Sequence, residues 1–227
     1  MLDNNDIIKK KIETRKAILA NNLVKWHAKN SPEYPWRKTS DPYHIMISEM
    51  LLRRTRASSV PDVYEKFLKK FPTVFSLAKS SVEEIENTIQ SLGMKSRANK
   101  MKSAAKMIVE KYSGKLPSGE KELLEIVGRE SQYTTNAIRC FALNQRVPIF
   151  DVNVKRIFER IFSVNFGNAA HKKRDSWEFV STTVPENNIR QYNWALLDLG
   201  KAVCTPQNPK CNICPLKSIC DYGQKQS

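Results

Sequence analysis

The chain has 227 residues, of which 41% are hydrophobic, and this length allows one large domain or two small ones, each with a buried core. It carries 38 Lys and Arg against 23 Asp and Glu, a formal net charge of +15, which favours a polyanionic partner, with nucleic acid as the first candidate. The sequence argues against a protein that spans a membrane, because no apolar run approaches the ~18 residues that a span requires. The first residues show no signal-peptide pattern, so we expect a cytoplasmic protein.

Apolar residues recur at helical spacing along most of the chain, and alternating runs typical of strands are few. Short connections marked by Pro and Gly separate the predicted elements. In chain order we expect helices over about 6–28, 43–54, 57–70, 81–91, 96–112, 119–127, 134–144, 152–163, 172–183 and 187–200. Ser81 and Glu84 form a predicted capping box at the start of the helix over 81–91. The sequence therefore predicts an all-α protein.

The end of the chain contains four cysteines in turn-forming sequence, with the spacing Cys-x6-Cys-x2-Cys-x5-Cys: Cys204, Cys211, Cys214 and Cys220. Two disulfides would suit a secreted protein, and nothing else in the sequence is typical of one. Zinc held by four cysteines usually takes two short hooks separated by a longer stretch. The single Cys-x-x-Cys with an outlying ligand on each side favours a [4Fe–4S] cluster over zinc. The fifth cysteine, Cys140, lies in an apolar run and is predicted to be a buried core thiol.

Several short motifs follow one another in a fixed order. They are Pro35-Trp36-Arg37, Asp41-Pro42-Tyr43, Ser48-Glu49-Met50-Leu51-Leu52-Arg53-Arg54-Thr55, Leu92-Gly93, Asp151-Val152-Asn153-Val154-Lys155-Arg156 and the four cysteines. In this order they resemble the helix-hairpin-helix DNA glycosylases of the endonuclease III superfamily, over about residues 25–221. Within the superfamily the chain is most similar to the thymine–guanine mismatch glycosylases, and next to the adenine glycosylases.

The resemblance implies two helical lobes with a DNA-binding groove between them. One is a six-helix barrel domain with a degenerate helix-hairpin-helix, here 31–148, and the other is a cluster domain formed by 1–30 and 149–227. Such enzymes flip the target nucleotide out of the duplex, because the glycosidic bond cannot be reached inside the stack. The expected partner is double-stranded DNA with a mismatched or damaged base. We expect a monomer without membrane contact, associated with the nucleoid.

Asp151 corresponds to the essential aspartate of the family. The residues alone indicate a simpler role, because an aspartate directly before Val152-Asn153-Val154 is a good N-cap for the following helix. The two roles are compatible, since a carboxylate at a helix N-terminus keeps its negative charge. That charge would stabilise an oxocarbenium-like transition state and could orient the attacking water.

Glu49 lies among apolar residues of the helix over 43–54. Glutamate residues in helices are usually exposed to solvent. The resemblance instead aligns it with a glutamate that adenine glycosylases use as a general acid on the base. Partial burial would suit proton donation, so we expect Glu49 to contact or protonate the base.

Tyr133 stands just before Thr134, where bifunctional relatives have a lysine that attacks the sugar as a Schiff base. A tyrosine packed at a helix start would be a purely structural alternative. No nearby lysine replaces the missing amine, since Arg129 and Arg139 cannot be deprotonated. The resemblance therefore implies a monofunctional enzyme, without AP-lyase activity, in which Tyr133 belongs to the catalytic site.

The hairpin departs from the family's Leu-Pro-Gly-Val-Gly, because the segment over 126–132 keeps only one glycine and has one residue inserted. This turn normally presents backbone N–H groups to a DNA phosphate, and Glu130 is unfavourable beside a phosphate. Arg53 and Arg54 replace the paired glutamines that fill the space left by the flipped base, and Met94 replaces a tyrosine wedge. The DNA-binding residues implied by the resemblance are Arg53, Arg54, Met94, Gly128, Gln132 and Thr134.

The leading interpretation is a monofunctional glycosylase of base excision repair that removes thymine or uracil mispaired with guanine. The alternative within the family is adenine excision opposite guanine or 8-oxoguanine. Against it we count the expected absence of a C-terminal oxoguanine-reading domain and the loss of the tyrosine wedge at Met94. A catalytically silent iron–sulfur DNA-binding protein is the alternative from another class. The presence of both Glu49 and Asp151 argues against that alternative.

Overall fold

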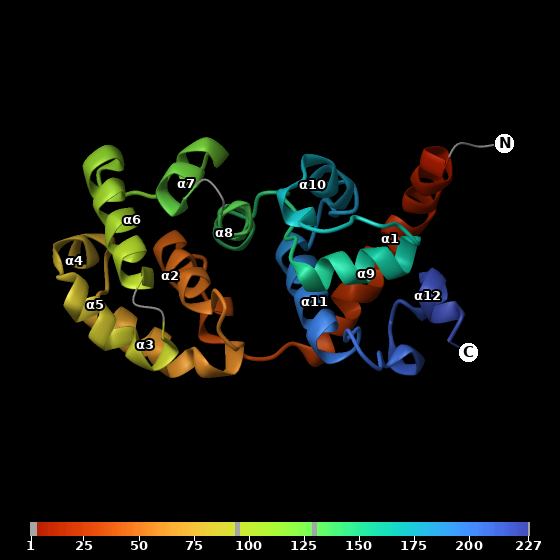
Figure 1. The fold of residues 1–227 in the computed structure, drawn as a ribbon, viewed down its shortest axis with the longest axis horizontal. Helices are drawn as coiled ribbons and strands as arrows, with labels where there is room; N and C mark the ends of the chain where they lie inside the picture. Colours follow the sequence, from red (N-terminus) through yellow and green to blue (C-terminus); the bar gives the residue numbers. More distant parts are fainter. Residues whose placement is uncertain (1–3, 94–95, 129–130, 227) are drawn as a thin grey trace. The chain divides into compact units, whose positions relative to one another are not determined.

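The structure is a computed structural model that describes residues 4–93, 96–128 and 131–226. Every regular element in these ranges is a helix (Figure 1), so the prediction of an all-α fold is confirmed. The chain divides into two compact units. Unit 1 consists of Met1–Pro32 and Asn144–Ser227, and unit 2 consists of Glu33–Leu143.

Unit 2 is built around helix α2, Pro42–Leu52. Asp41 caps its start, with its side chain accepting from the backbone N–H of His44 at 3.0 Å, and Pro42 occupies the first turn, where no N–H is needed. Most α2 side chains are buried, including Ile45, Met46, Ile47, Glu49 and Leu51. Helix α2 therefore lies inside the unit and serves as its core element.

The remaining helices of unit 2 surround α2 or pack against its neighbours. They are η1 (Pro35–Arg37), η2 (Ala57–Ser59), α3 (Pro61–Lys70), α4 (Val74–Lys79), α5 (Val82–Ile89), η3 (Gln90–Leu92), α6 (Ser96–Tyr112), α7 (Glu120–Val127), α8 (Gln132–Ala137) and the π-helix η4 (Ile138–Ala142). Helices α3, α6, α8 and η4 contact α2 directly, while α4 and α5 pack on α6. The predicted capping box at Ser81 and Glu84 is confirmed at the start of α5.

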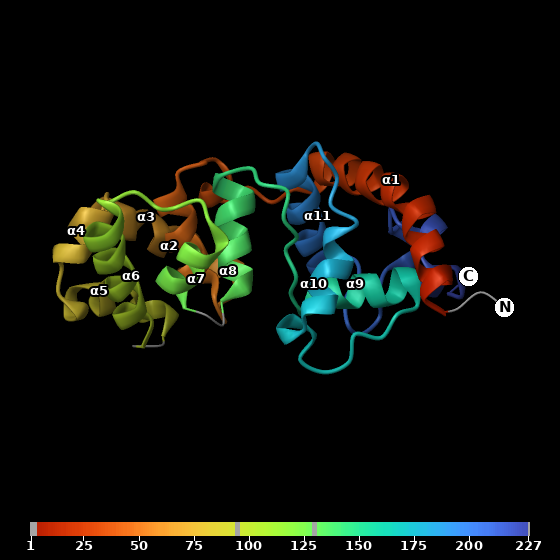
Figure 2. The ribbon, with the colours of Figure 1, turned by 90° about the horizontal axis from the view of Figure 1, so that it is seen from above.

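Unit 1 pairs the N-terminal helix with helices from the second half of the chain. Its elements are α1 (Asn4–Asn30), α9 (Val152–Phe162), η5 (Ala170–Lys172), α10 (Arg174–Ser181), α11 (Ile189–Ala202), η6 (Cys211–Ile213), η7 (Lys217–Ile219) and α12 (Asp221–Gln224). Helix α1 packs along α11 (Figure 2), and α9 packs against both α11 and α12.

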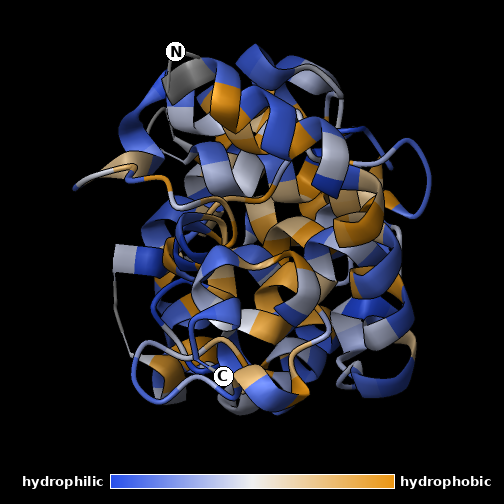
Figure 3. Cartoon of the chain, turned by 90° about the vertical axis from the view of Figure 1, so that its right-hand side faces the viewer, coloured by the Kyte–Doolittle hydropathy of each residue, from blue (hydrophilic) through white to orange (hydrophobic). Residues whose placement is uncertain are grey.

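Rings from α9 and α10 fill part of the unit 1 core. Phe158 and Phe162 stack at 5.8 Å between centroids, and Phe179 meets both rings edge-on. Hydrophobic and hydrophilic residues alternate along the helices (Figure 3), and the hydrophobic residues Val154, Ile157 and Ile161 of α9 are buried. None of the described helices is long and apolar enough to cross a membrane.

The structure corrects two helix predictions in unit 2. Helix α2 ends at Leu52, two residues before the predicted end, because Arg53 is extended and Arg54 has the left-handed φ of 57°. The helix predicted over 134–144 begins at Gln132 and continues as the π-helix η4, in which Cys140 is fully buried as predicted. Helix α4 was not predicted.

Candidate functional site

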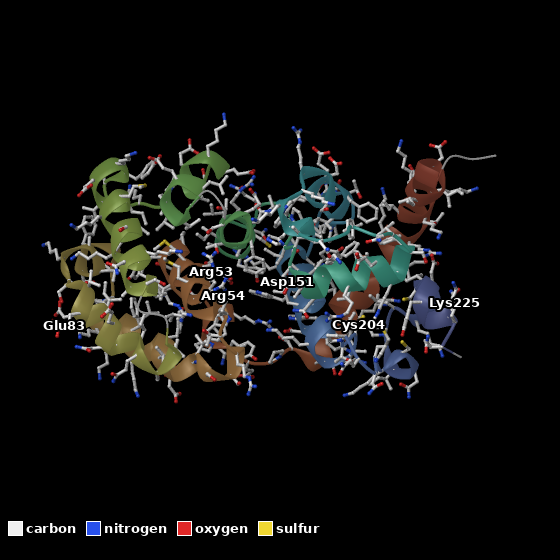
Figure 4. The ribbon with its side chains drawn as sticks, viewed as in Figure 1. Arg53, Arg54, Glu83, Asp151, Cys204 and Lys225 are labelled. Atoms are coloured by element: carbon white, nitrogen blue, oxygen red, sulfur yellow. The ribbon has the colours of Figure 1, made fainter. Side chains whose placement is uncertain are left out.

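Asp151 is the N-cap of α9, and its carboxylate is held by three hydrogen bonds. Oδ1 accepts from the backbone N–H groups of Asn153 and Val154, and Oδ2 accepts from the side-chain amide Nδ2 of Asn153, each at 2.8 Å. The predicted cap is thereby confirmed. Asp151 is a half-buried residue (labelled in Figure 4), and its carboxylate has an orientation fixed by these bonds.

A chain of hydrogen bonds continues from Asp151 to the cysteine-rich loop. Asn153, which donates to Asp151, accepts from Nη2 of Arg156 at 2.9 Å through its Oδ1. Arg156 in turn donates to the carbonyl of Gly200 at 2.8 Å and through Nε to the carbonyl of Cys204 at 2.7 Å. Helix α9 thus connects the carboxylate at its start with the first cysteine of the loop.

Gly200 allows α11 to approach this network closely. A Cβ atom at Gly200 would lie 2.6 Å from Cβ of Asn153, a separation that side chains do not adopt. Glycine is therefore required at this contact for spatial reasons, independent of its backbone flexibility. The position of Asn153, and through it that of Asp151, depends on the α9–α11 contact.

The four loop cysteines form a donor set that suits a soft metal centre. Arg160 donates from Nη1 to Sγ of Cys204 at 3.2 Å, and the backbone N–H of Gly223 donates to Sγ of Cys220 at 3.3 Å. Hydrogen bonds of this kind stabilise metal-bound thiolates. Arg160 also lies over the ring of Tyr222, 4.7 Å from its centroid, which fixes the guanidinium beside the loop.

The thiols also influence one another's ionisation. Burial raises the pKa of the Cys214 thiol to about 11, a backbone hydrogen bond with Leu216 opposes this, and the neighbouring thiols of Cys204, Cys220 and Cys211 raise it further. Closely spaced thiolates therefore need a cationic centre to coexist, and binding that centre releases their protons. Within the described ranges, no three His, Cys, Asp or Glu side chains lie close enough together to bind a single metal ion. A [4Fe–4S] cluster has a different requirement, because each of its four cysteines binds a separate iron.

A second candidate site is a pocket of about 170 Å³ within unit 2. Four of its lining residues are cationic and none of the described ones is acidic: Met50, Arg53, Arg54, Ser96, Arg97, Lys100, Val127, Ser131 and Thr134. Arg53 reaches across it and donates from Nη1 to Oγ of Ser131 at 3.4 Å. The pocket joins the exit of α2 to the start of α8 and is suited to an anionic ligand.

The structure brings together only some of the residues that the sequence predicted. Arg53, Arg54 and Thr134 line the pocket, and Glu49 is buried one residue before the pocket residue Met50. Tyr133 is half-buried on the first turn of α8. Asp151 and the four cysteines belong to unit 1.

The turn before α8 carries the surviving hairpin glycine. Gly128 has a φ of 100°, a backbone conformation that favours glycine, and its carbonyl accepts from the N–H of Ser131 at 2.8 Å. Gln132 is held by Glu120 and Asn136 through its side-chain amide, at 3.0 and 3.2 Å. The predictions for Met94 and Glu130 lie outside the described residues.

Sequence reasoning did not identify several residues of these sites. No role was predicted from the sequence for four residues that line the pocket: Ser96, Arg97, Lys100 and Ser131. The roles of Asn153, Arg156 and Arg160 depend on contacts with α11 and the cysteine loop. The spacing of Arg156 and Arg160, one helical turn apart, was the available signal for one shared face.

Comparison with known proteins identifies the family. Residues 47–181 match the HhH-GPD superfamily base excision DNA repair protein family, and residues 204–220 match the iron-sulfur binding domain of endonuclease III. The chain therefore belongs to the HhH-GPD superfamily of base excision DNA repair proteins, and it is a DNA N-glycosylase. DNA is its substrate, and the predicted [4Fe–4S] cluster is confirmed as its cofactor.

Individual relatives place the chain within that superfamily. It is 33% identical to the thymine/uracil-DNA glycosylase of Methanothermobacter thermautotrophicus, over 94% of this chain and 96% of the relative. It is 34% identical to an adenine DNA glycosylase of Buchnera aphidicola, over 87% of this chain but only 56% of the relative. A solved thermostable thymine-DNA glycosylase superposes with a TM-score of 0.87 at 30% identity, covering 94% of this chain and 98% of the other.

Proposed function

We propose that this protein is a monofunctional DNA glycosylase that removes thymine or uracil mispaired with guanine and leaves an intact abasic site. The observation that carries the proposal is the Asp151 carboxylate, which three hydrogen bonds hold at the N-terminus of α9 in a half-buried residue. The choice of thymine or uracil is supported by similarity to the thymine/uracil-DNA glycosylase along nearly the whole chain.

In the proposed reaction Asp151 acts on the sugar. As the glycosidic bond breaks, positive charge develops on the ring, and a fixed carboxylate stabilises that charge without reorganising. The N-terminus of α9 favours a negative charge at this place. Because Asn153 occupies Oδ2 and the backbone N–H groups occupy one side of Oδ1, the orientation of the carboxylate is set before DNA binds.

We propose that Glu49 contacts or protonates the nucleobase that is removed, and that Tyr133 lies at the mouth of the pocket that receives it. Glu49 is 7% exposed on the core helix α2, and a buried acid is suited to contact or protonate a departing base. Tyr133 has no amine, so it cannot form a Schiff base with the sugar. Arg53, Arg54 and Thr134 line the basic pocket, and we assign them, together with Met94, Gly128 and Gln132, to contacts with the DNA.

The cluster has a structural role in this proposal. Cys204, Cys211, Cys214 and Cys220 would hold it, and when bound it cross-links the loop that follows α11. Arg156 and Arg160 tie that loop to α9. We further assign the predicted domains, the barrel of 31–148 and the cluster domain of 1–30 with 149–227, to a monomer that works at the nucleoid.

Adenine excision is the second candidate, because the adenine DNA glycosylase of Buchnera aphidicola is 34% identical over 87% of this chain. Single-turnover assays on duplexes containing T:G, U:G, A:G and A:8-oxoguanine pairs separate the two functions. We expect strand breakage after alkali with T:G and U:G only. If adenine were released faster than thymine, the protein would be an adenine glycosylase. If no duplex lost a base although DNA still bound, the protein would be a catalytically silent DNA-binding protein.

A further inference from the structure

We propose that Arg97 is a positioning residue that holds the exit of α2 so that Arg54 is presented to DNA in a fixed backbone conformation. Arg97 lies on the first turn of α6 and is only 4% exposed. The inference builds on the proposed contact between Arg54 and the space left by a displaced base. It concerns binding rather than the excision step.

The guanidinium of Arg97 binds three acceptors at the end of α2. Nη1 donates to the carbonyl of Leu51 at 3.0 Å, and Nη2 donates both to the carbonyl of Arg53 at 2.7 Å and to Oγ1 of Thr55 at 3.0 Å. The last carbonyls of a helix lack intrahelical donors, so these bonds also cap α2. One nitrogen of Arg97 thus binds the residues on both sides of Arg54.

Arg54 itself needs this support. Its φ of 57° lies in the left-handed region, which residues with a Cβ atom rarely adopt. The backbone N–H of Thr55 closes the turn by donating to the carbonyl of Leu52 at 3.0 Å. Side-chain bonds from a buried arginine to both flanking residues keep Arg54 in a conformation that it would otherwise leave.

The surroundings of Arg97 argue that the turn is kept for a ligand rather than for stability. Burial lowers the pKa of the Arg97 guanidinium, and the nearby charge of Arg53 lowers it further, so the cation is held there at a cost. Arg53, Arg54 and Lys100 line the same pocket, without an acidic neighbour among its described lining residues. Such a concentration of positive charge is relieved when a polyanion binds.

The test compares Arg97→Met with Lys100→Met in the full-length holoprotein. Both variants remove one positive charge from the pocket and keep an unbranched apolar stem, but only the first removes the bonds to the α2 exit. Binding to matched and mismatched duplexes is measured over a range of salt concentrations. Unstacking is followed by the fluorescence of 2-aminopurine placed beside the mismatch, and circular dichroism verifies folding.

For Arg97→Met we expect discrimination between mismatched and matched duplex to fall on the order of 10-fold, the size of one lost specific contact, with a weaker 2-aminopurine signal. The salt dependence of binding should not change, because Arg97 is buried. For Lys100→Met we expect a shallower salt dependence and retained discrimination. In an Arg54→Ala background, Arg97→Met should add nothing further, since it acts through Arg54.

Thr55→Val removes one acceptor of Arg97 at nearly constant side-chain volume. If Arg97→Met does not fold, Thr55→Val tests in its place whether Arg97 positions Arg54. We expect Thr55→Val to weaken discrimination in the same direction. Unchanged discrimination in folded Arg97→Met, or in Thr55→Val when Arg97→Met is unfolded, would overturn the proposal. A full effect of Arg97→Met in the Arg54→Ala background would overturn it as well. Because every readout is binding or fluorescence, a protein that excised no base would leave this test intact.

Discussion

At the scale of single residues, Asp151 combines a structural and a chemical role in one carboxylate. Asn is also a good N-cap, so Asp151→Asn should retain the cap of α9 while removing the negative charge. We expect excision in single-turnover assays to fall roughly 10²-fold or more, with duplex affinity retained. Excision at the wild-type rate would show that Asp151 serves only as the helix cap.

Tyr133 supports a second prediction at this scale. Without an amine at this position no imine can form with the opened sugar. Borohydride treatment during turnover should therefore give no covalent protein–DNA complex, and strands should break only after alkali. Tyr133→Lys is the informative companion variant, since a lysine in reach of the sugar would restore trapping. A covalent adduct with the wild-type protein would mean that another lysine reaches the sugar.

At the scale of helices, the α9–α11 contact sets the position of Asn153 and hence of Asp151. Gly200→Ala would place a Cβ atom 2.6 Å from Cβ of Asn153, so one of the two helices has to shift. We expect excision to fall by about 10-fold or more through misplacement of the carboxylate. Duplex affinity should stay within a few-fold of the wild type.

The matched control is Ala202→Ser, which adds one atom at an exposed position of the same helix and should leave excision unchanged. Visible absorbance of the cluster should be retained in both variants. If Gly200→Ala excised bases as fast as Ala202→Ser, the α9–α11 contact would not set the position of Asp151.

Helix α12 depends on charge contacts with α1. Asp221 pairs with Lys11 at 2.6 Å and with Arg15 at 2.7 Å. Burial alone would raise the pKa of Asp221, but the hydrogen bonds and charges of Lys11 and Arg15 outweigh it and lower the pKa below its ordinary value. The stabilisation is therefore present above the unfolded-state pKa of about 3.9 and is lost as the pH falls through the lower folded-state value.

Asp221→Asn should accordingly lower the melting temperature at pH 7, and the difference from the wild type should shrink as the pH falls below the unfolded-state pKa of about 3.9. Thermal melts followed by circular dichroism at several pH values would measure this. A difference that grew toward low pH would have the wrong sign for this ion pair. Asp62→Asn, at the first turn of α3, is a control on another helix.

The helices also show how far the sequence determines the fold. Long helices with apolar residues at helical spacing were predicted closely, as with α6 over 96–112, because their periodicity is local information. The end of α2 was not predictable, because it depends on Arg97, which lies 46 residues after Leu51 and 44 residues after Arg53. Helix α4 was missed because it has only six residues, and its capping box uses Ser76 rather than Glu or Gln.

The candidate site follows the same division. Asp151 and Glu49 were predicted because the resemblance assigns roles to residue types at fixed places, and the four cysteines were predicted from their spacing. The contacts that position Asp151 were not predicted. Asn153, Arg156 and Gly200 come together only when α9 packs on α11. Long-range contacts of this kind leave no pattern in a single sequence.

At the scale of the whole molecule, charge determines how DNA is found. A net charge of +15 is spread along the chain, and the pocket in unit 2 presents Arg53, Arg54 and Lys100 beside the buried Arg97. Each phosphate that a lysine or arginine neutralises releases condensed counterions, so the logarithm of the association constant falls linearly with the logarithm of salt concentration. We expect six or more such contacts on non-specific duplex, which corresponds to a loss of affinity on the order of 10³-fold between 50 and 200 mM salt.

Fluorescence anisotropy with a matched duplex would measure this slope. The mismatched duplex should give nearly the same slope with a higher affinity throughout, because the contacts that recognise the displaced base add to the phosphate contacts rather than replace them. A flat salt dependence with both duplexes would mean that the basic surface does not bind the DNA backbone. A steeper slope with the mismatch alone would mean that recognition adds phosphate contacts, and Arg54→Ala would then reduce the slope as well as the discrimination.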